Sequence, residues 1–508
     1  ARVRGVVVGV VQVKDDGRRD DKWLVAPDGR WTWRQFDQRW QRLAAHLHER
    51  GIGEGDRVAI LAKNSEFLVN ALFATARLGA VAVVLNWRLQ AAELDYILSD
   101  SDPAALLYEG AFAATAQTLL DTRTLALVLR HGGEGEGVDY AHLMQSEATP
   151  VPEAAGPGGQ AMAVIMYPSG TTGRPKGAML PHEALVWTAQ GNAHTLVWHQ
   201  DHRFLLVAPL FHIGGLSPLM TNMLTGCTTV LLPEFEPQQV WQTIAAERIT
   251  SMMCVPLMLQ ALLMLAQKVP VDASSLVSVT CGASLVPKAL IEAALAQGIG
   301  VQQVYGITEF CGAVCFWTQD MGLAHAHTQG RPVLHAQLRI VDPATLQEVP
   351  QGHDGEIWCR GPMRFSGYWR NAAATQAALH GEWYRSGDIG HIDAEGFVTV
   401  VDRLKDLIIS GGENIYPAEL EAVIASLPGV AEVAVIGRAD ARWGEVPVAF
   451  VVRRPGSELD ADAVIALCRE RLAGYKCVKA VVFVEALPRN PVGKVLKQRL
   501  KDSSGAVQ

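Results

Sequence analysis

The feature of the sequence that most restricts the fold is a glycine-rich segment at residues 167–177, Tyr-Pro-Ser-Gly-Thr-Thr-Gly-Arg-Pro-Lys-Gly. The apolar run 161–167 predicts a buried strand that leads into it, and an apolar stretch from Ala184 predicts a helix after it. Glycine lets backbone N–H groups approach an anion closely, because no Cβ blocks the path. The hydroxyl groups of the segment and the amine of Lys176 add donors and positive charge. The pattern predicts a phosphate-binding loop, and a flexible surface linker is the alternative.

Composition narrows the class of protein. A chain of 508 residues is too long for one core, so roughly two to four domains or subdomains are expected. The net charge of −8 argues against a nucleic-acid partner. The cysteines show no zinc-ligand spacing, and Cys311 and Cys315 are expected to be buried thiols rather than metal ligands. Reduced cysteines suit a cytoplasmic enzyme, and the sequence predicts no transmembrane segment, because it lacks a run of about 18 apolar residues.

Strand and helix patterns alternate along the first part of the chain. Predicted strands at 58–61 and 81–85 alternate with predicted helices at 66–78 and 91–98. This alternation predicts an α/β fold with mainly parallel sheets covered by helices on both faces. Residues 131–160 are rich in glycine, glutamate and proline, which predicts a surface connection.

The later part of the chain has a different pattern. Residues 356–388 are β-rich with glycine turns, and the charged run 402–406 separates them from a new α+β unit of about a hundred residues. We therefore expect a large N-terminal domain, residues 1–403, of stacked α/β sheets plus a small β-barrel-like part. A smaller, mobile α+β C-terminal domain is expected over residues 404–508.

Several motifs together resemble one family. The segment 167–177 lacks the spacing of a Walker loop. It resembles the signature loop of the adenylate-forming superfamily, which includes acyl-CoA synthetases, peptide-synthetase adenylation domains and luciferases. Tyr305-Gly306-Ile307-Thr308-Glu309 and Pro491-Val492-Gly493-Lys494 resemble further motifs of that family in the same order. The resemblance covers nearly the whole chain and is closest in pattern to bacterial fatty-acyl and aryl-CoA ligases.

The resemblance implies a binding site for ATP and Mg²⁺. Tyr305 would lie by the adenine ring, Thr308 near the α-phosphate, and Glu309 would bind Mg²⁺, with Thr172 as a second ligand. One carboxylate plus phosphate oxygens suits Mg²⁺, which prefers hard oxygen ligands and keeps several waters. The loop residues that would contact the β- and γ-phosphates are Ser169, Gly170, Thr171, Thr172, Gly173 and Lys176.

The resemblance also implies roles in the second half of the chain. Asp388 would accept hydrogen bonds from both ribose hydroxyls, since its two oxygens can each take one donor, and Arg403 would be a second ribose contact. Lys405 occupies the hinge position. Lys494 would be catalytic and reach the carboxylate, the α-phosphate and the bridging oxygen during adenylation. A path for CoA is implied by matches at Gly411, Gly412 and Trp443.

A substrate pocket is predicted near the end of the strand 204–208. Ligands of open parallel sheets bind beyond the carboxyl ends of strands, and His212 follows this strand after a proline turn. His212 either packs locally or, as the resemblance implies, lies catalytically between the acyl pocket and the pantetheine tunnel. Small and apolar residues are assigned to the pocket: Phe211, Gly214, Gly282 and Gly306. For Gly282, close helix–strand packing explains the small residue equally well.

The most consistent interpretation is an AMP-forming carboxylic acid:CoA ligase that uses ATP, Mg²⁺ and coenzyme A on an apolar acid. The turn at Phe211-His212 carries no acid to pair an amine, which disfavours amino-acid substrates. Fatty and aromatic acids both stay open, as does a homodimer. The alternatives are an acyl-adenylate ligase that loads a carrier-protein thiol, and a non-catalytic nucleotide-binding protein. The run 475–479 departs from the family pattern, because a valine replaces a proline, and this leaves the contacts with CoA phosphates open.

Overall fold

The computed structural model describes residues 22–151, 158–168, 175–196, 198, 201–284, 286–410, 413–489 and 495–504. The described residues form two compact units. The first contains the described residues of 1–168, 175–338 and 359–384, and the second those of 339–358 and 385–508. The predicted domain boundary after residue 403 stays a prediction. No helix among the described residues is long and apolar enough to cross a membrane.

The first unit contains an eight-stranded sheet in the order β19-β9-β8-β4-β3-β5-β6-β7. The pairs from β8 through β4, β3, β5 and β6 to β7 are parallel, and β9 joins β8 and β19 antiparallel. This confirms the expected mainly parallel sheet. The strands are β3 (Arg57–Leu61), β4 (Val81–Val84), β5 (Ala105–Glu109), β6 (Leu127–His131), β7 (Val138–Asp139), β8 (Met162–Met166), β9 (Ala178–Pro181) and β19 (Gly367–Tyr368).

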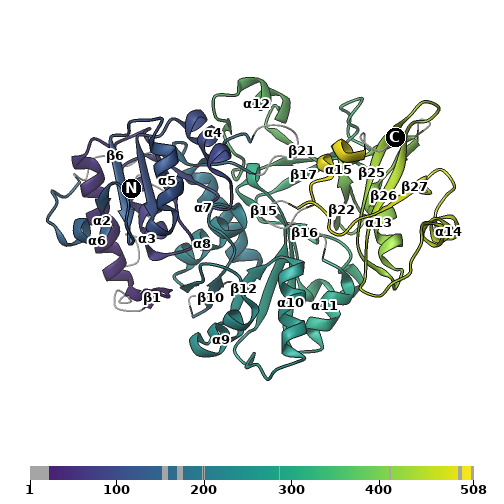
Figure 1. Cartoon of the computed structure of the whole chain (residues 1–508), viewed down its shortest axis with the longest axis horizontal. Coiled ribbons are helices and arrows are strands. Elements are labelled where there is room, and N and C mark those ends of the chain that lie inside the picture. Colours follow the sequence, from purple (N-terminus) through teal and green to yellow (C-terminus); the bar gives the residue numbers. More distant parts are fainter. Residues whose placement is uncertain are drawn as a thin grey trace. The chain divides into compact units, whose positions relative to one another are not determined.

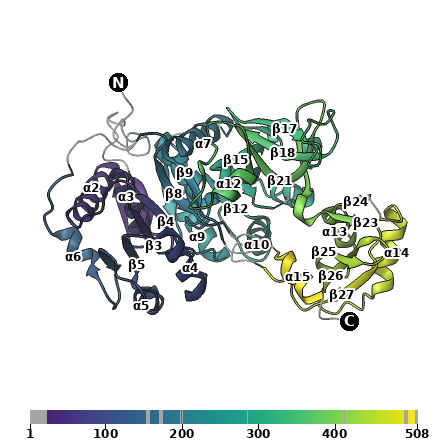
Figure 2. The same cartoon turned by 90° about the horizontal axis from the view of Figure 1, so that it is seen from above.

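Helices cover both faces of this sheet. Figure 2 shows α2 (Trp33–Glu49) and α3 (Glu66–Arg77) side by side on one face, with α4 (Ala91–Ser101) and α5 (Ala113–Leu120) on the other. The short helix α6 (Tyr140–Gln145) packs against α2 and β6. The strands are apolar on both sides, as a doubly covered sheet requires, and buried residues such as Leu61 and Leu106 form its core.

A second, nine-stranded sheet of the first unit follows the order β16-β15-β14-β13-β12-β10-β11-β1-β2. The run from β14 to β1 is parallel, while β15, β16 and β2 are antiparallel additions at its ends. Its strands are β1 (Lys22–Ala26), β2 (Gly29–Thr32), β10 (Arg203–Leu206), β11 (Thr228–Leu231), β12 (Ser251–Cys254), β13 (Ser278–Gly282), β14 (Gly300–Ile307), β15 (Gly312–Trp317) and β16 (Arg331–Pro332).

Helices α7 to α11 precede or connect strands of this sheet along the chain. In Figure 1, α10 and α11 lie side by side next to β12, and they contact each other and strands β13 and β14. Helices α7 and α8 pack against each other and against β15. Their bounds are α7 (His182–Thr195), α8 (Ile213–Thr225), α9 (Pro237–Glu247), α10 (Pro256–Ala266) and α11 (Lys288–Leu295).

The predicted β-rich stretch forms a five-stranded sheet. Its order is β17-β18-β21-β20, and β22 also pairs with the long strand β21. The elements are β17 (Gln337–Val341), β18 (Gly355–Arg360), α12 (Ala372–Ala378), β20 (Leu379–His380), β21 (Trp383–Ile392) and β22 (Val398–Arg403).

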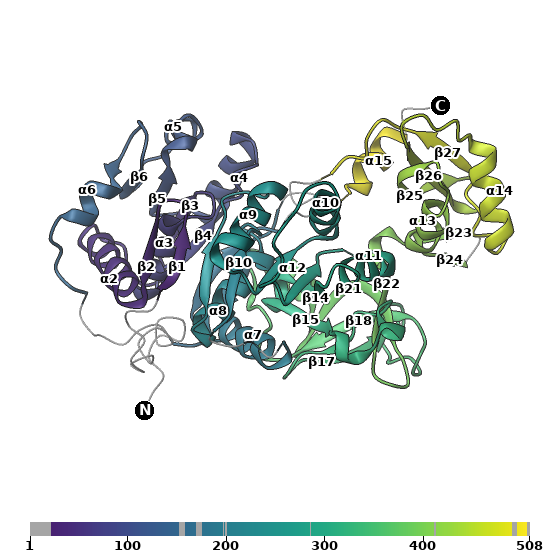
Figure 3. The same cartoon turned by 90° about the horizontal axis from the view of Figure 1, so that it is seen from below.

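The C-terminal part of the second unit is an α+β fold with its own core, as predicted. The sheet order is β24-β23-β26-β25, and β27 pairs parallel with β26. Figure 3 shows α13 and α14 beside these strands, where they contact each other, β25 and β27. The elements are β23 (Ile408–Ser410), β24 (Glu413–Ile415), α13 (Pro417–Ala425), β25 (Val430–Asp440), β26 (Gly444–Arg453), α14 (Ala461–Arg471), β27 (Ala480–Phe483) and α15 (Lys497–Ser504).

The helix predicted from Ala184 is confirmed as α7, and the strand β9 stands between the predicted phosphate loop and this helix. β9 pairs antiparallel with β8, with Met166 opposite Ala178. The prediction for the stretch before the loop is wrong in part. Residues 131–160 are not only a surface connection, because α6 places Tyr140 in the interior. There the Tyr140 hydroxyl accepts from the Asn70 amide at 2.6 Å and lies 3.2 Å from a carboxylate oxygen of Glu66.

Candidate active site

Three neighbouring parts of the nine-stranded sheet bring predicted site residues to one edge. β10 precedes His212, β13 ends at Gly282, and β14 runs directly into Thr308 and Glu309. These strands are parallel, so their carboxyl ends meet at the same edge, where open α/β sheets bind ligands. The structure therefore confirms that His212 follows a strand at this edge of the sheet, and its role at a ligand stays a prediction.

A polar cluster joins residues from three separate motifs. The Tyr368 hydroxyl donates to Glu309 Oε1 at 2.7 Å, and Lys176 Nζ lies 5.4 Å from the centre of the Tyr368 ring. Burial, followed by the negative charge of Glu309, raises the pKa of Tyr368, so its hydroxyl stays a donor. The Glu309 backbone oxygen accepts from Phe365 N at 2.8 Å, which holds the segment in place. Tyr368 is a member of this cluster that the sequence interpretation missed.

The two ends of the predicted phosphate loop are anchored. The Tyr167 hydroxyl donates to Asp100 Oδ2 at 2.6 Å, and Trp369 Nε1 donates to the Asp100 backbone oxygen at 3.0 Å. The Trp369 backbone N–H donates to the Gly177 oxygen at 2.7 Å. The loop residues Ser169, Gly170, Thr171, Thr172 and Gly173 lie outside the described residues, and their roles stay predictions.

A largely apolar cavity lies at the same edge, with about 570 Å³ of space not filled by protein atoms, including its open mouth. Helices α7 and α8 and strands β14 and β15 supply much of its wall. The lining residues are Asn192, Leu196, Trp198, Phe204, His212, Ile213, Gly214, Ser217, Pro218, Met253, Thr280, Ala283, Val304, Gly306, Gly312, Ala313 and Phe316. Such a cavity suits the apolar part of a small organic ligand.

His212 is the N-cap of α8. Its Nδ1 accepts from the Gly214 backbone N–H at 3.0 Å, so in the neutral ring the proton resides on Nε2. Burial lowers the pKa of His212 to about 4, and the imidazole is therefore uncharged at neutral pH. The local role of His212 is confirmed, because the ring caps a helix. The ring also lines the cavity, and its catalytic role stays a prediction.

The predicted pocket residues divide into two groups. His212, Gly214 and Gly306 line the cavity, whereas Phe211 and Gly282 are not among the lining residues. Phe211 packs edge-on against Trp87, with ring centroids 6.4 Å apart. A Cβ on Gly282 would come within 2.3 Å of a Val304 methyl carbon, so close packing against β14 explains the glycine.

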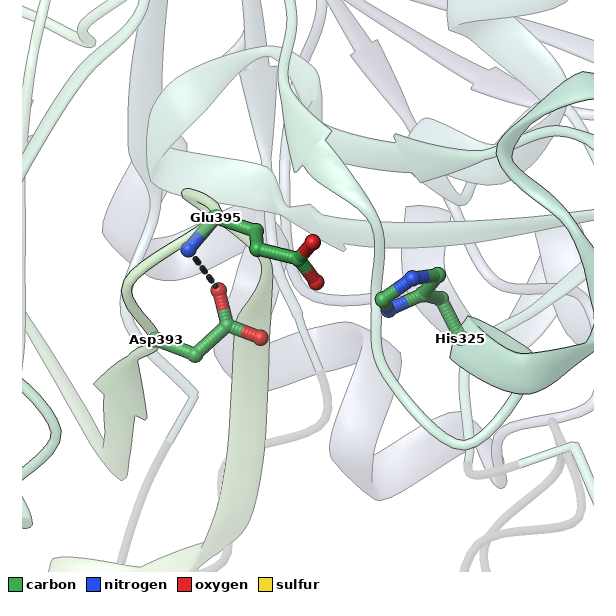
Figure 4. Close-up of side chains that lie close together, drawn as sticks. All are labelled: His325, Asp393 and Glu395. Atoms are coloured by element: carbon green, nitrogen blue, oxygen red, sulfur yellow. Dashed lines mark hydrogen bonds between the residues drawn. The ribbon is translucent and has the colours of Figure 1, made fainter.

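In the second unit, one hairpin joins the two residues assigned to ribose. Asp388 on β21 is opposite Arg403 on β22, and Arg403 Nε lies 2.5 Å from Asp388 Oδ1. At the hairpin turn, Asp393 Oδ1 accepts from the Glu395 N–H at 2.9 Å (Figure 4). The same oxygen accepts from the Phe397 N–H at 2.9 Å. The structure thus brings Asp388 and Arg403 together.

Glu356 supports this site and was missed from the sequence. It is only 2% exposed, and Oε2 lies 3.0 Å from the Arg385 guanidinium and accepts from Trp358 Nε1 at 2.8 Å. Oε1 accepts from the Gly387 backbone N–H at 3.2 Å. Gly387 has φ of +68°, which favours glycine, so Glu356 stabilises the turn before Asp388.

Tyr305 lies on β14 in the first unit and is half-buried, and two further predicted residues are described in the second unit. Trp443 is in the turn between β25 and β26, 45% exposed, with the Arg442 guanidinium 4.8 Å from its ring centre. Lys405 is exposed in a short 3₁₀ turn between β22 and β23. Gly411, Gly412 and Lys494 lie outside the described residues.

Two family models match the sequence. The family model "AMP-binding enzyme" matches residues 12–369, and "AMP-binding enzyme C-terminal domain" matches residues 419–494. An indoleacetate–CoA ligase from Aromatoleum aromaticum is 40% identical over 91% of this chain and 91% of that protein. The long-chain-fatty-acid–CoA ligase FadD13 from Mycobacterium tuberculosis is 37% identical over 94% of each chain.

A solved structure is similar over almost the whole chain. The O-succinylbenzoate coenzyme A synthetase from Bacillus subtilis, in complex with ATP and a magnesium ion, has a TM-score of 0.86 and 31% identity. The match covers 98% of this chain and 99% of that chain. Because a family model spans more than half of the sequence and these relatives match it nearly end to end, the chain belongs to the AMP-binding, adenylate-forming enzymes.

Proposed function

We propose that this enzyme is an AMP-forming acyl-CoA synthetase for an apolar carboxylic acid. A carboxylate oxygen attacks the α-phosphorus of ATP, and pyrophosphate leaves. The CoA sulfur then attacks the acyl carbon, its thiol proton passes to solvent, and AMP leaves with the electrons of the broken C–O bond. The acid is already a nucleophile, so the first step needs positioning and charge neutralisation rather than a general base.

One observation of the structure carries this proposal. On β14, Gly306 lines the apolar cavity, and Thr308 and Glu309 follow only two and three residues later. A carboxylate at the mouth of the cavity therefore lies beside the segment assigned to the α-phosphate and the metal ion. Reacting groups must be held about 3–3.5 Å apart, and a single strand that serves both sites would favour this.

The residues of the polar cluster fit Mg²⁺. Tyr368 donates to one oxygen of Glu309, and among the described residues no side chain donates to the second oxygen, Oε2. A carboxylate with one free oxygen, next to phosphates, is the donor set that Mg²⁺ prefers. Glu309 would hold the ion, which when bound neutralises negative charge on the phosphate oxygens. Lys176 would add positive charge from the same side.

The cavity and the relatives both support the proposal that the acid is apolar. Curated relatives act, by their names, on indoleacetate, ferulate and long-chain fatty acids. The cavity of this chain is mostly apolar and offers no charged side chain among its lining residues. An amino acid or a dicarboxylate would bury a second, unpaired charge there, which is costly. The eight buried free thiols suit a reducing compartment, and a cytoplasmic location is part of this proposal.

The test is a panel of carboxylic acids with ATP and Mg²⁺, read out as pyrophosphate and AMP, with and without CoA. We expect AMP release with apolar acids to require CoA, and α-amino acids and malonate to be poor substrates. Turnover of acid and ATP with CoA, in the absence of a carrier protein, distinguishes this function from the loading of a carrier-protein thiol. Malonate or an amino acid as the preferred substrate would contradict the proposal, and no turnover with any acid would favour a nucleotide-binding protein without catalysis.

A further prediction concerns the ribose. Asp388 is 2% exposed and, by our assignment, accepts from both ribose hydroxyls. We expect Asp388→Ala to raise the KM for ATP roughly 10- to 100-fold, because hydrogen bonds to a charged acceptor are lost. Wild-type enzyme should prefer ATP over 2′-deoxy-ATP, and the variant should lose this preference. An unchanged preference would remove Asp388 from the ribose site, whatever happens to stability.

A further inference from the structure

One polar side chain stands out in the apolar cavity. Asn192 on α7 lines the cavity and is only 5% exposed. Its Oδ1 is buried and has no hydrogen-bond partner among the residues that the structure describes. Most buried polar atoms in folded proteins are paired, and an unpaired one needs an explanation.

The orientation of the Asn192 amide follows from its neighbours on α8. Nδ2 donates to Ser217 Oγ at 3.0 Å and to Thr221 Oγ1 at 3.1 Å. The Thr221 hydroxyl uses its own proton on the Ser217 backbone oxygen at 2.9 Å, so its oxygen can only accept from Asn192. A flipped amide would place two acceptors against each other. Both amide protons are therefore used toward α8, and Oδ1 is the atom left for another donor.

A second unpaired oxygen nearby provides a contrast. Thr188 Oγ1 lies one turn earlier on α7 and is also buried without a partner among the described residues. Thr188 is not a lining residue of the cavity, whereas Asn192 is. Of these two side chains, Asn192 is therefore the one positioned to meet a ligand in the cavity.

The position of Asn192 along the cavity sets where the donor must lie. His212 caps α8 at the sheet edge, and Ser217 and Thr221 follow five and nine residues later. At a rise of 1.5 Å per residue, Ser217 and Thr221 lie about 7–14 Å from His212 along the axis of α8. The Asn192 amide, which bonds to both, faces this part of the helix. The aromatic rings of Trp198, Phe204 and Phe316 supply apolar wall in this cavity.

We propose that Asn192 Oδ1 is a specificity determinant, and that the acid is an aromatic carboxylic acid with an N–H or O–H donor on its ring. This inference rests on the proposed function and decides between the fatty and aromatic acids that the sequence left open. An alkyl chain would cover Oδ1 without a donor, and the enzyme would then bury an unsatisfied acceptor. Sites built to bond a polar group of the substrate reject analogues that lack it.

The experiment compares matched acids that differ only in the donor. The pairs are indole-3-acetate with benzothiophene-3-acetate, 4-hydroxyphenylacetate with 4-methylphenylacetate, and 4-hydroxycinnamate with 4-methylcinnamate. We expect the donor-bearing member of at least one pair to have a kcat/KM roughly 10- to 100-fold higher, as follows from the cost of leaving a buried acceptor unpaired. Decanoate, which has no donor, should be poorer than that acid.

Two variants assign the preference to Asn192. Asn192→Leu, of similar size, should abolish the preference or reverse it in favour of the donor-free acid. Thr188→Val removes the other unpaired oxygen of the same helix and should keep the preference. Retention of the full preference in Asn192→Leu would overturn the inference.

The comparison of matched acids with the wild-type enzyme tests the inference without any variant. Equal or better use of the donor-free acid in every pair would overturn the inference while the ligase function stands. No AMP from any acid would instead overturn the proposed function and the inference with it.

Discussion

Replacement of Lys494 by alanine is expected to slow adenylation by about 100- to 1,000-fold, the usual cost of removing one preorganised charge from a transition state. Thioester formation from supplied acyl-adenylate and CoA should stay near the wild-type rate. The reason is that a positive charge on Lys494 would stabilise the α-phosphate and carboxylate only while the P–O bond forms. The assignment rests on the match of Pro491-Val492-Gly493-Lys494 to the family motif.

The measurement is a pair of single-turnover assays, one with acid and ATP, the other with isolated acyl-adenylate and CoA. Arg489→Ala provides a control close in sequence, since Arg489 forms a half-exposed ion pair with Glu432 at 2.8 Å. Such pairs contribute about 0–1 kcal/mol, so both half-reactions should persist. Equal loss of both half-reactions in Lys494→Ala would contradict the assigned role.

The second large effect is expected at Glu309. Glu309→Gln keeps the size of the side chain and an oxygen that can accept from Tyr368, but removes the negative charge assigned to Mg²⁺. Adenylation should slow about 100- to 1,000-fold, and the Mg²⁺ concentration for half-maximal rate should rise. Pyrophosphate release in single-turnover experiments over a series of Mg²⁺ concentrations measures both quantities.

Tyr368→Phe is the matched control for Glu309. It removes the 2.7 Å hydrogen bond to Glu309 but leaves the carboxylate charge. The adenylation rate should therefore fall far less than in Glu309→Gln. Because the pKa of Tyr368 is raised, the wild-type phenol should add no ionisation of its own to the pH–rate profile near neutrality. A loss in Tyr368→Phe as large as in Glu309→Gln would show that positioning, not charge, dominates at this site.

The sequence predicted strands of the large domain where they are apolar and regularly spaced. Predicted strands 58–61 and 81–85 correspond to β3 and β4, with bounds that differ by one residue at most. It did not predict β9, because a four-residue segment next to a loop has too little pattern to separate a strand from the start of a helix. Helix α6 was hidden by the glycine and glutamate residues around it.

The candidate site was predictable only where contiguous motifs carry it. Thr308 and Glu309 follow β14 within one motif, and Asp388 and Arg403 meet on one hairpin. Tyr368 and Glu356 act through folding that joins distant segments, so no local pattern indicates them. Asn192 is one of several polar residues on α7, and its unpaired oxygen is visible only in three dimensions.

One strand, β14, and two helices, α7 and α8, contribute to the cavity wall. This division affects how the enzyme can acquire new substrates. Strand β14 contributes both cavity wall and the segment with Glu309, so a substitution there risks the chemistry. Helices α7 and α8 contribute Asn192, Ser217 and Pro218 to the wall but none of the described residues assigned to ATP or metal. Substrate choice can therefore diverge by drift or by laboratory selection on the two helices while the adenylating strand stays constant. Libraries for altered acid use belong at these helix positions.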